Sequence, residues 1–292
     1  MADNVIYLST GGFNSKLPCQ TVKKFLNFGV NKIELSGGAY DPFTLSGLNK
    51  FIPEASFQVH NYFPPPKRHF VFNLASCNKD VCDLSFSHAK KSIRLAKSLG
   101  CNKYSFHAGF LLDPKVSELG KPIRFKKLFN REKALDIFLN NVSKLSSFAA
   151  NLNINLSIEN NVFSEGNSKI FDCNPFLMTA ADECNYIISN TPENVGLLVD
   201  VAHLKVSANS LGFNPITFLK ECGAHIDSYH LSDNNGKNDS NSLISEESWF
   251  WDYINPNLDY YSVEVYNDDM NLLVEQYNFV KEKIKNLSSS IE

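Results

Sequence analysis

The chain has 292 residues, of which 43% are hydrophobic and 20% are charged. This composition supplies a sizeable core and excludes disordered and fibrous proteins. The 28 basic and 31 acidic residues give a formal net charge of −3, which offers no overall attraction for a nucleic acid. Residues 1–8 lack the basic and apolar segments of a signal peptide, and no apolar run approaches the roughly 20 residues of a membrane span. We therefore expect a cytoplasmic protein without a membrane partner, and a nucleic-acid partner is not favoured.

Short runs rich in β-branched and aromatic residues alternate with longer segments of helical periodicity. Eight such runs are expected to be strands, at residues 5–9, 32–35, 57–60, 103–107, 155–159, 196–200, 228–230 and 262–265. Alternating strands and helices form a parallel sheet, and eight strands close a barrel. The expected fold class is α/β, a (β/α)8 TIM barrel that forms a single domain over residues 1–292.

The helical candidates carry apolar residues three and four positions apart. They lie around residues 22–28 and 93–99, and at residues 132–150, 175–188, 215–222 and 270–287. Pro175 and Pro215 suit the first turn of a helix, and Gly100 suits the position just beyond a helix end. We expect the serine tail at residues 288–290 to fray.

Two segments between strands are longer than a minimal repeat requires. Residues 64–74 follow the third strand, and residues 111–131 follow the fourth. In barrels the loops that follow the strands carry the active site. We therefore expect both insertions to wall a pocket.

The sequence also excludes several kinds of site. Its seven cysteines are scattered and include no Cys-x-x-Cys pair, so we expect reduced, mostly buried thiols. It lacks a Gly-x-Gly-x-x-Gly turn after a strand, a Walker loop and a Gly-x-Ser-x-Gly elbow. We expect no nucleotide cofactor.

The later strands end in residues of the types that bind metals. These residues are His60, His107, Glu159, Asp200, His230 and Glu264. In a barrel the strand ends converge, and three carboxylates in one cavity repel one another unless a divalent cation neutralises them. A mixture of imidazole and carboxylate suits zinc, manganese, cobalt or iron better than calcium. The pattern predicts a metal site.

Further polar residues could complete this pocket. His203, just beyond the sixth strand, could follow a turn back into the pocket as a ligand or a substrate contact. Glu34, at the end of the second strand, could bind substrate or orient a ligand. Asp233 and Asp239, in the polar loop after the seventh strand, offer further oxygen atoms. Three histidines have no strand-end position and are expected to be structural: His69, His88 and His225.

In order and spacing these residues resemble the xylose isomerase-like TIM barrel superfamily. That superfamily holds sugar and sugar-phosphate isomerases and epimerases together with the endonuclease IV group. The matching segments are Val59-His60-Asn61-Tyr62, Phe106-His107-Ala108-Gly109, Ile158-Glu159-Asn160, Asp200-Val201-Ala202-His203, His230-Leu231-Ser232-Asp233 and Val263-Glu264-Val265. They extend from about residue 30 to residue 266 and so cover most of the chain.

The resemblance to the isomerases and epimerases implies one divalent ion, manganese, zinc or cobalt. The implied ligands are Glu159, Asp200, His230 and Glu264. Glu159 and Glu264 would also move protons on opposite faces of the substrate, and His203 would hold a substrate oxygen. The cation would stabilise an enediolate. The main hypothesis is therefore a metal-dependent sugar or sugar-phosphate isomerase or epimerase of carbohydrate metabolism.

In this hypothesis the substrate is a small molecule that several further side chains contact. Residues assigned to substrate binding are Glu34, His60, His107 and Asp233, with His60 and His107 as alternative ligands of a second metal. Aromatic residues that could stack on the sugar, or else pack in the core, are Tyr62, Phe110, Trp249 and Trp251.

The endonuclease IV group implies an alternative function, zinc-dependent cleavage of phosphodiesters at abasic DNA. That group binds three zinc ions, and its third site matches His203, Asp239 and, in place of a final histidine, Asn241. A neutral amide oxygen is a poor zinc ligand, so this position argues against the alternative. Basic residues of the two insertions could face DNA or solvent: Lys67, Arg68, Arg124, Lys126 and Lys127.

A third hypothesis is a barrel that binds a sugar or a metal without catalysis. The outer helices carry enough apolar residues for a homodimer face, although core packing explains these residues equally well.

Overall fold

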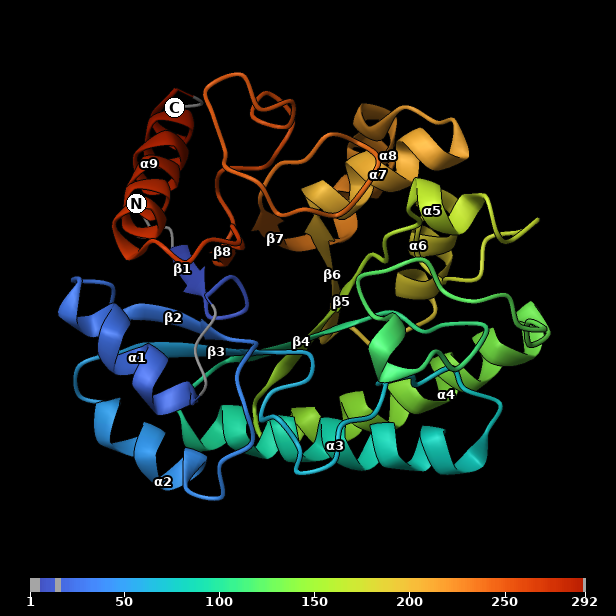
Figure 1. Ribbon diagram of the computed structural model, residues 1–292, viewed down its shortest axis with the longest axis horizontal. Coiled ribbons are helices and arrows are strands. Elements are labelled where there is room, and N and C mark those ends of the chain that lie inside the picture. The colour runs from blue at the N-terminus through green and yellow to red at the C-terminus, as the bar shows by residue number, and fades with distance from the viewer. Residues whose placement is uncertain (1–5, 14–16, 291–292) are drawn as a thin grey trace.

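The computed structural model describes residues 6–13 and 17–290. Eight parallel strands form a closed barrel in chain order, and helices surround it (Figure 1). The strands are β1 (Ile6–Ser9), β2 (Lys32–Leu35), β3 (Ser56–His60), β4 (Lys103–His107), β5 (Asn155–Glu159), β6 (Val195–Asp200), β7 (Ile226–Leu231) and β8 (Tyr261–Val263). The predicted TIM barrel is confirmed, and only Val5, at the start of the first expected strand, lies outside the described residues.

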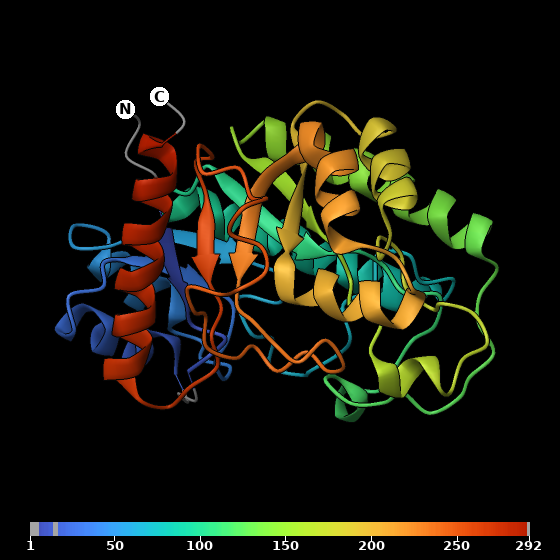
Figure 2. The same ribbon diagram turned by 90° about the horizontal axis from the view of Figure 1, so that it is seen from above.

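The longer helices lie outside the barrel. The helices are α1 (Pro18–Asn27), α2 (Thr44–Leu48), α3 (Lys79–Ser98), α4 (Arg131–Ala150), α5 (Glu165–Ser168), α6 (Ala181–Ser189), α7 (Val201–Leu211), α8 (Pro215–Cys222) and α9 (Met270–Ser289). Helices α3 and α4 lie side by side (Figure 1), and α9 lies against β1 and β8 (Figure 2). Among the described residues, no helix is long and apolar enough to cross a membrane.

Alternate residues of each strand face the helices and the barrel interior. Outward residues such as Ile33, Phe106 and Val199 are fully buried in the main hydrophobic core between strands and helices. Interior positions include small polar residues such as Ser105 and Ser157, which are also buried. Because these side chains are small, they leave room for larger histidines and carboxylates at the strand ends.

One predicted helix begins later than expected because long-range contacts override the local pattern. The helix expected from Pro175 begins at Ala181 instead. The segment at Pro175 pairs with the chain after β4, because the Leu111 amide donates to the Pro175 carbonyl at 2.7 Å. Arg131 donates to the carbonyl of Phe176 at 2.9 Å, which fixes the same segment in an extended form.

The chain just beyond β6 also differs from expectation. His203 lies in the first turn of α7, which no helical candidate covered, rather than in a turn. Asp200 acts as the N-cap of this helix, since its side chain accepts from the His203 amide at 2.8 Å.

The serine tail does not fray at residues 288 and 289. Helix α9 continues to Ser289, and the Ser288 hydroxyl donates to the Pro256 carbonyl at 2.8 Å. All seven cysteines are unpaired, as expected, although only Cys101, Cys184 and Cys222 are fully buried.

The two insertions are packed against each other at Gly109, just after β4. A Cβ atom on Gly109 would lie 2.3 Å from the Cβ atom of Ala75, which is closer than real contacts allow. Nearby, the buried Asn73 side chain donates to the carbonyls of Phe110 and Leu112 at 3.1 and 3.2 Å. Glycine at position 109 therefore lets the first insertion lie directly on the second.

We expect Gly109→Ala to lower the free energy of unfolding by about 1–3 kcal/mol, because Ala75 and its backbone must move to admit the methyl group. Gly223→Ala is the matched control, since no described atom lies within 4 Å of its added Cβ. The control should stay within about 0.5 kcal/mol of the parent protein. Urea unfolding measures both, and equal effects of the two substitutions would contradict the packing argument.

Candidate active site

Most of the predicted site residues meet at the carboxyl ends of the strands. His60, His107, Glu159 and Asp200 are the last residues of β3, β4, β5 and β6. The parallel register pairs His107 with Glu159 and Asp200 with His230. Together with Glu34 at the end of β2 and Glu264 just beyond β8, this register brings side chains from seven strands to one end of the barrel.

Four residues form a compact, buried group that could hold a metal ion: Glu159, Asp200, His230 and Glu264. Their ligand atoms all lie within 4.8 Å of one another. His230 Nδ1 lies 2.8 Å from Glu264 Oε2 and 3.2 Å from Glu159 Oε1. Both Glu159 oxygens, Asp200 Oδ2 and His230 Nδ1 make no hydrogen bond to any described residue.

Buried polar atoms without hydrogen bonds are costly, and here they point toward a common centre. A divalent cation at that centre would satisfy all of them at once. Three carboxylates and one imidazole suit manganese, zinc or cobalt. The donor set therefore fits the metal that the sequence predicted.

The ionisation of these carboxyls reflects their burial. The pKa of Asp200 is raised to about 7, chiefly by burial and also by the neighbouring Asp239 and Glu159, against the lowering effect of His203. Burial also raises the pKa of Glu264, against the lowering effect of His230. A bound cation favours the ionised form of both groups, so metal binding and proton release are coupled here.

A second layer of side chains orients His230. Glu34 Oε2 accepts hydrogen bonds from His230 Nε2, at 2.9 Å, and from the Tyr260 hydroxyl. Burial alone would raise the pKa of Glu34, but His230 and Tyr260 lower it to about 2. Although burial lowers the pKa of His230, Glu34, Glu159 and Glu264 together raise it well above its usual value. A metal would therefore bind Nδ1 in place of a proton, while Glu34 keeps the proton on Nε2. Glu34 does not line the pocket, which favours ligand orientation over substrate contact.

His60 and His107 form a second group around Glu159. His60 Nε2 and His107 Nδ1 lie 3.3 and 2.9 Å from Glu159 Oε2. Burial lowers the pKa of His60 to about 3, so its ring is neutral at physiological pH and able to bind a metal. Its Nδ1 lies 2.9 Å from the Ser105 hydroxyl, which fixes the ring.

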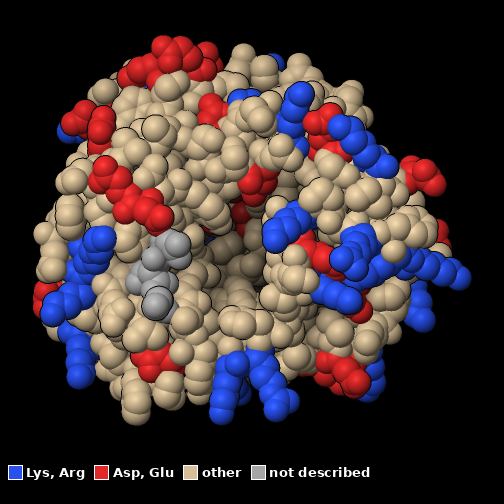
Figure 3. All heavy atoms as spheres, viewed as in Figure 1, with Lys and Arg blue, Asp and Glu red and all other residues tan. Residues whose placement is uncertain are grey.

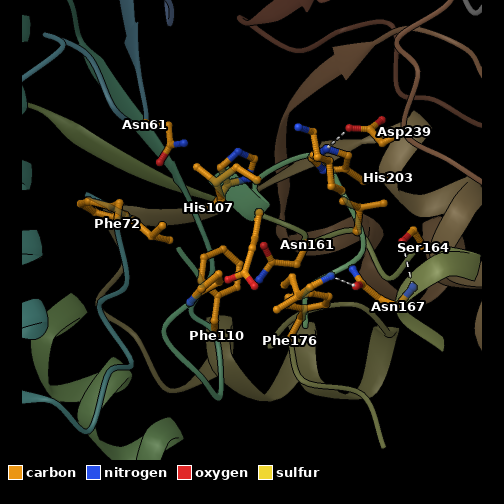
Figure 4. Close-up of a pocket in the computed structure, with 18 of the residues that line it drawn as sticks. Asn61, Phe72, His107, Phe110, Asn161, Ser164, Asn167, Phe176, His203 and Asp239 are labelled. Atoms are coloured by element: carbon orange, nitrogen blue, oxygen red, sulfur yellow. Dashed lines mark hydrogen bonds and ion pairs between the residues drawn. The ribbon is translucent and has the colours of Figure 1, made fainter. Parts of the chain in front are cut away.

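A pocket of about 580 Å³ opens at these strand ends (Figure 3). Of the four metal-ligand candidates, Glu264 is the one that lines it, whereas Glu159 is fully buried beside His107. His203 lines the pocket too, with Nε2 3.1 Å from Asp239 Oδ2. Figure 4 shows His107, His203 and Asp239 together in one part of this pocket.

Both insertions contribute to the pocket wall, as predicted. The first supplies His69, Phe70, Val71 and Phe72, and the second supplies, among others, Val116, Leu119 and Ile123. Of the aromatic residues proposed to stack on a sugar, Tyr62 and Phe110 line the pocket. Trp249 and Trp251 instead pack against the hydrophobic core.

Of the four predicted substrate-binding residues, His107 lines the pocket, whereas Glu34, His60 and Asp233 do not. Asp233 accepts from Lys205 Nζ at 2.6 Å and from the Ser248 hydroxyl at 2.8 Å, and it does not line the cavity. These two hydrogen bonds fix the loop after β7 and leave the Asp233 carboxylate directed away from a substrate in the pocket.

Two pocket residues were missed from the sequence. His69, which we expected to be structural, lines the pocket and stacks on Tyr62. Tyr266 also lines it, with its hydroxyl 3.5 Å from Glu264 Oε1. The signal for Tyr266 was its position two residues beyond Glu264, since alternate residues of an extended chain share a face.

The sequence is similar to that of a known protein family. The family model of the xylose isomerase-like TIM barrel matches residues 23–260. The chain belongs to this family. No curated protein is similar enough in sequence to count as a relative.

Several solved structures share the fold. A D-tagatose 3-epimerase-like protein is 18% identical, with a TM-score of 0.74 over 98% of this chain and 99% of that one. An L-ribulose 3-epimerase is 14% identical, with a TM-score of 0.71 over 99% and 97%. D-psicose 3-epimerase from Clostridium cellulolyticum H10, with D-tagatose, is 11% identical, with a TM-score of 0.65 over 96% and 98%. At these identities the similarity establishes the shared xylose isomerase-like fold.

We expect manganese binding to weaken about tenfold for each pH unit below about 7, because a protonated Asp200 must lose its proton to bind. Calorimetric titration between about pH 5 and 8 measures the affinity. Asp233→Asn is the control and should leave both affinity and pH dependence unchanged, because Asp233 pairs with Lys205. An affinity that is constant over this range would contradict the coupling.

We expect Glu34→Gln to weaken manganese binding by about 10- to 100-fold, since it removes the charge that orients His230. Tyr260→Phe keeps that charge and removes only the second hydrogen bond, so its effect should be smaller. Titration calorimetry at one pH measures both variants. Parent-like affinity in Glu34→Gln would show that Glu34 does not position the ligand.

Proposed function

We propose that this protein is a divalent-metal-dependent isomerase or epimerase of a sugar or sugar phosphate that works by proton transfer at carbon. The observation that carries the proposal is the convergence of four ligand atoms within 4.8 Å at the end of a pocket large enough for a sugar. The names of the structural neighbours agree, since those compared above are sugar 3-epimerases or an epimerase-like protein.

The pocket provides the groups that such a reaction needs. A cation bound by Glu159, Asp200, His230 and Glu264 would stabilise negative charge on an enediolate. Glu264 faces the pocket and can take or return a proton at the substrate carbon. Glu159 is the second acid–base candidate; it is buried beside His107, whose Nδ1 lies 2.9 Å from Glu159 Oε2. His203 Nδ1 is held by the Asn160 carbonyl, and Nε2, which lies 3.1 Å from Asp239 Oδ2, would bind a substrate oxygen that takes the place of that carboxylate.

We expect the manganese-loaded protein to exchange a carbon-bound proton of a ketose with deuterated water. Glu264→Gln and Glu159→Gln should each lower the exchange rate at least about 100-fold, because each removes an acid–base group. The control is Glu165→Gln, a partly exposed residue of α5 that pairs with Lys169 and does not line the pocket, and it should exchange at the parent rate. Elemental analysis of each variant at saturating manganese separates loss of acid–base chemistry from loss of metal.

Full exchange activity in both site variants would disprove their roles. Full metal occupancy in the parent protein, with no exchange for any sugar of a broad ketose panel, would favour the barrel that binds without catalysis.

A second function, endonuclease IV-like phosphodiester cleavage, is favoured by one observation, the additional group of His60, His107 and Glu159. The wall of the pocket is less suited to DNA. Lys126 of the second insertion already binds Glu118, with Nζ and Oε2 3.1 Å apart. Retention of abasic duplex DNA at low salt, lost steeply as salt rises, would support this function. No retention at low salt would remove it.

We further propose that the protein acts in the cytoplasm, because its seven cysteines are unpaired.

A further inference from the structure

The pocket extends from the polar site residues into a second part with apolar walls, which we name the outer chamber. Its residues are Phe72, Phe110, Val116, Leu119, Ile123 and Phe176. Figure 4 shows Phe110 and Phe176 in one part of the pocket, His107 and His203 in another, and Asn161 between them. One cavity therefore joins a polar, metal-ligating end to an apolar end.

Several residues of the outer chamber pack against a hydrophobic cluster of their own. Ile123 and Phe176 belong to a small hydrophobic cluster that is separate from the main core, and Phe110 packs against it. Phe110 and Phe176 also contact each other edge to face, with ring centroids 5.5 Å apart. These residues are thus packed side by side rather than scattered over the surface.

Buried polar side chains hold this wall in place. Asn161 donates to the carbonyls of Ala108, Gly109 and Leu177 at 3.0 to 3.1 Å. Arg131 donates to the Phe176 carbonyl at 2.9 Å. The apolar wall is therefore a preformed surface, which loses little entropy when a ligand binds.

A free sugar could stack on one aromatic ring of this wall but would fill only part of the pocket. A ketohexose has about a dozen non-hydrogen atoms and, at the roughly 30 Å³ that a water molecule occupies in the liquid, fills no more than about 360 Å³. The pocket measures about 580 Å³. Hydroxyl groups gain nothing from aromatic and aliphatic side chains that offer no hydrogen bond, whereas an apolar group does.

The charges of the pocket do not favour a phosphate at this end. Among the described residues that line the pocket, Lys121 is the one lysine, and it is exposed in the turn beside Gly120. Lys126 is close in sequence but is held by Glu118 and by the Asp113 carbonyl. Phosphate sites use fixed cationic or amide donors, and the outer chamber presents mainly carbon.

We infer that the substrate is a ketose or keto sugar that carries an apolar substituent, aryl or alkyl, on its end remote from the reacting carbons. The sugar part of this assignment rests on the proposed function. The polar end receives the carbonyl and its neighbouring hydroxyl, and the outer chamber receives the substituent. Phe110 is then a specificity-determining residue, because it forms part of the wall of the outer chamber and contacts Phe176 there.

The test compares D-fructose, 6-O-benzyl-D-fructose and D-fructose 6-phosphate on the manganese-loaded protein. Affinity is measured by calorimetry, and exchange of carbon-bound protons with deuterated water is followed separately. The benzyl ether should bind at least about tenfold more tightly than D-fructose, as expected for burial of an aromatic ring. Equal affinities, tightest binding of the phosphate, or no binding of the benzyl ether would overturn the inference.

Two phenylalanines provide matched variants. Phe110→Ala should reduce the preference for the benzyl ether to within about threefold, because it removes part of the apolar wall. Phe125→Ala should keep the full preference, because Phe125 is 71% exposed and does not line the pocket. Leu119→Ser, at a position 48% exposed, tests the chamber without disturbing a buried residue and should weaken the preference. An unchanged preference in both Phe110→Ala and Leu119→Ser would also overturn the inference.

The binding and exchange measurements can fail independently. Preferential binding of the benzyl ether without exchange of any sugar would support the outer chamber and contradict the proposed function. Exchange of D-fructose without preference for the benzyl ether would support the proposed function and overturn the inference.

Discussion

Electrostatic repulsion among buried carboxylates is the constraint on which the site depends. Glu159, Asp200 and Glu264 bring ligand atoms within 4.8 Å of one another and of His230, in a part of the protein that water scarcely reaches. Buried charges of one sign destabilise a fold unless they are paired or neutralised. In this barrel the histidines provide part of the compensation, and the raised pKa of Asp200 shows that it is incomplete. In the proposed function a divalent cation would supply the remainder and convert the repulsion into binding energy.

The two ends of the pocket are built from different parts of the fold. Strand ends supply the polar end, and the rigid parallel register fixes the distances between its side chains. Insertions after β3 and β4 supply the apolar wall. Since loops change more readily than strands, this division lets one chemistry be combined with different substrates. In the proposed function the strand-end residues would carry out the chemistry, and the insertions would determine which substrate is accepted.

The sequence was sufficient to predict the barrel and the residues that converge at its strand ends. Both follow from local patterns, because strand periodicity places alternate residues inside and barrel closure brings the strand ends together. The sequence was insufficient where one residue has two roles, or where a contact with a residue far away in the chain decides the local structure. Asp200 is both a ligand candidate and the N-cap of α7, so the helix begins without a separate start signal. Pro175 has the pattern of a helix start, but pairing with the chain after β4 holds it extended.

Function within the site was harder to predict for the same reason. Glu34 lies at a strand end like the ligands, yet its side chain reaches the far nitrogen of His230 rather than the pocket. Asp233 lies in a loop beside the site and is occupied by Lys205. Nothing local in the sequence distinguishes these carboxylates from Glu264, because the difference lies in which partner each one meets in the folded chain.

Metal content measures the central claim most directly. Protein purified without chelators or metal-affinity steps, and analysed for elements, should contain about one manganese, zinc or cobalt ion per chain, as the four-residue group of ligands requires. Two or three zinc ions per chain would shift the account toward the endonuclease IV-like function. Protein that contains no metal and takes up none on reconstitution would contradict the claim that this cluster is a metal site.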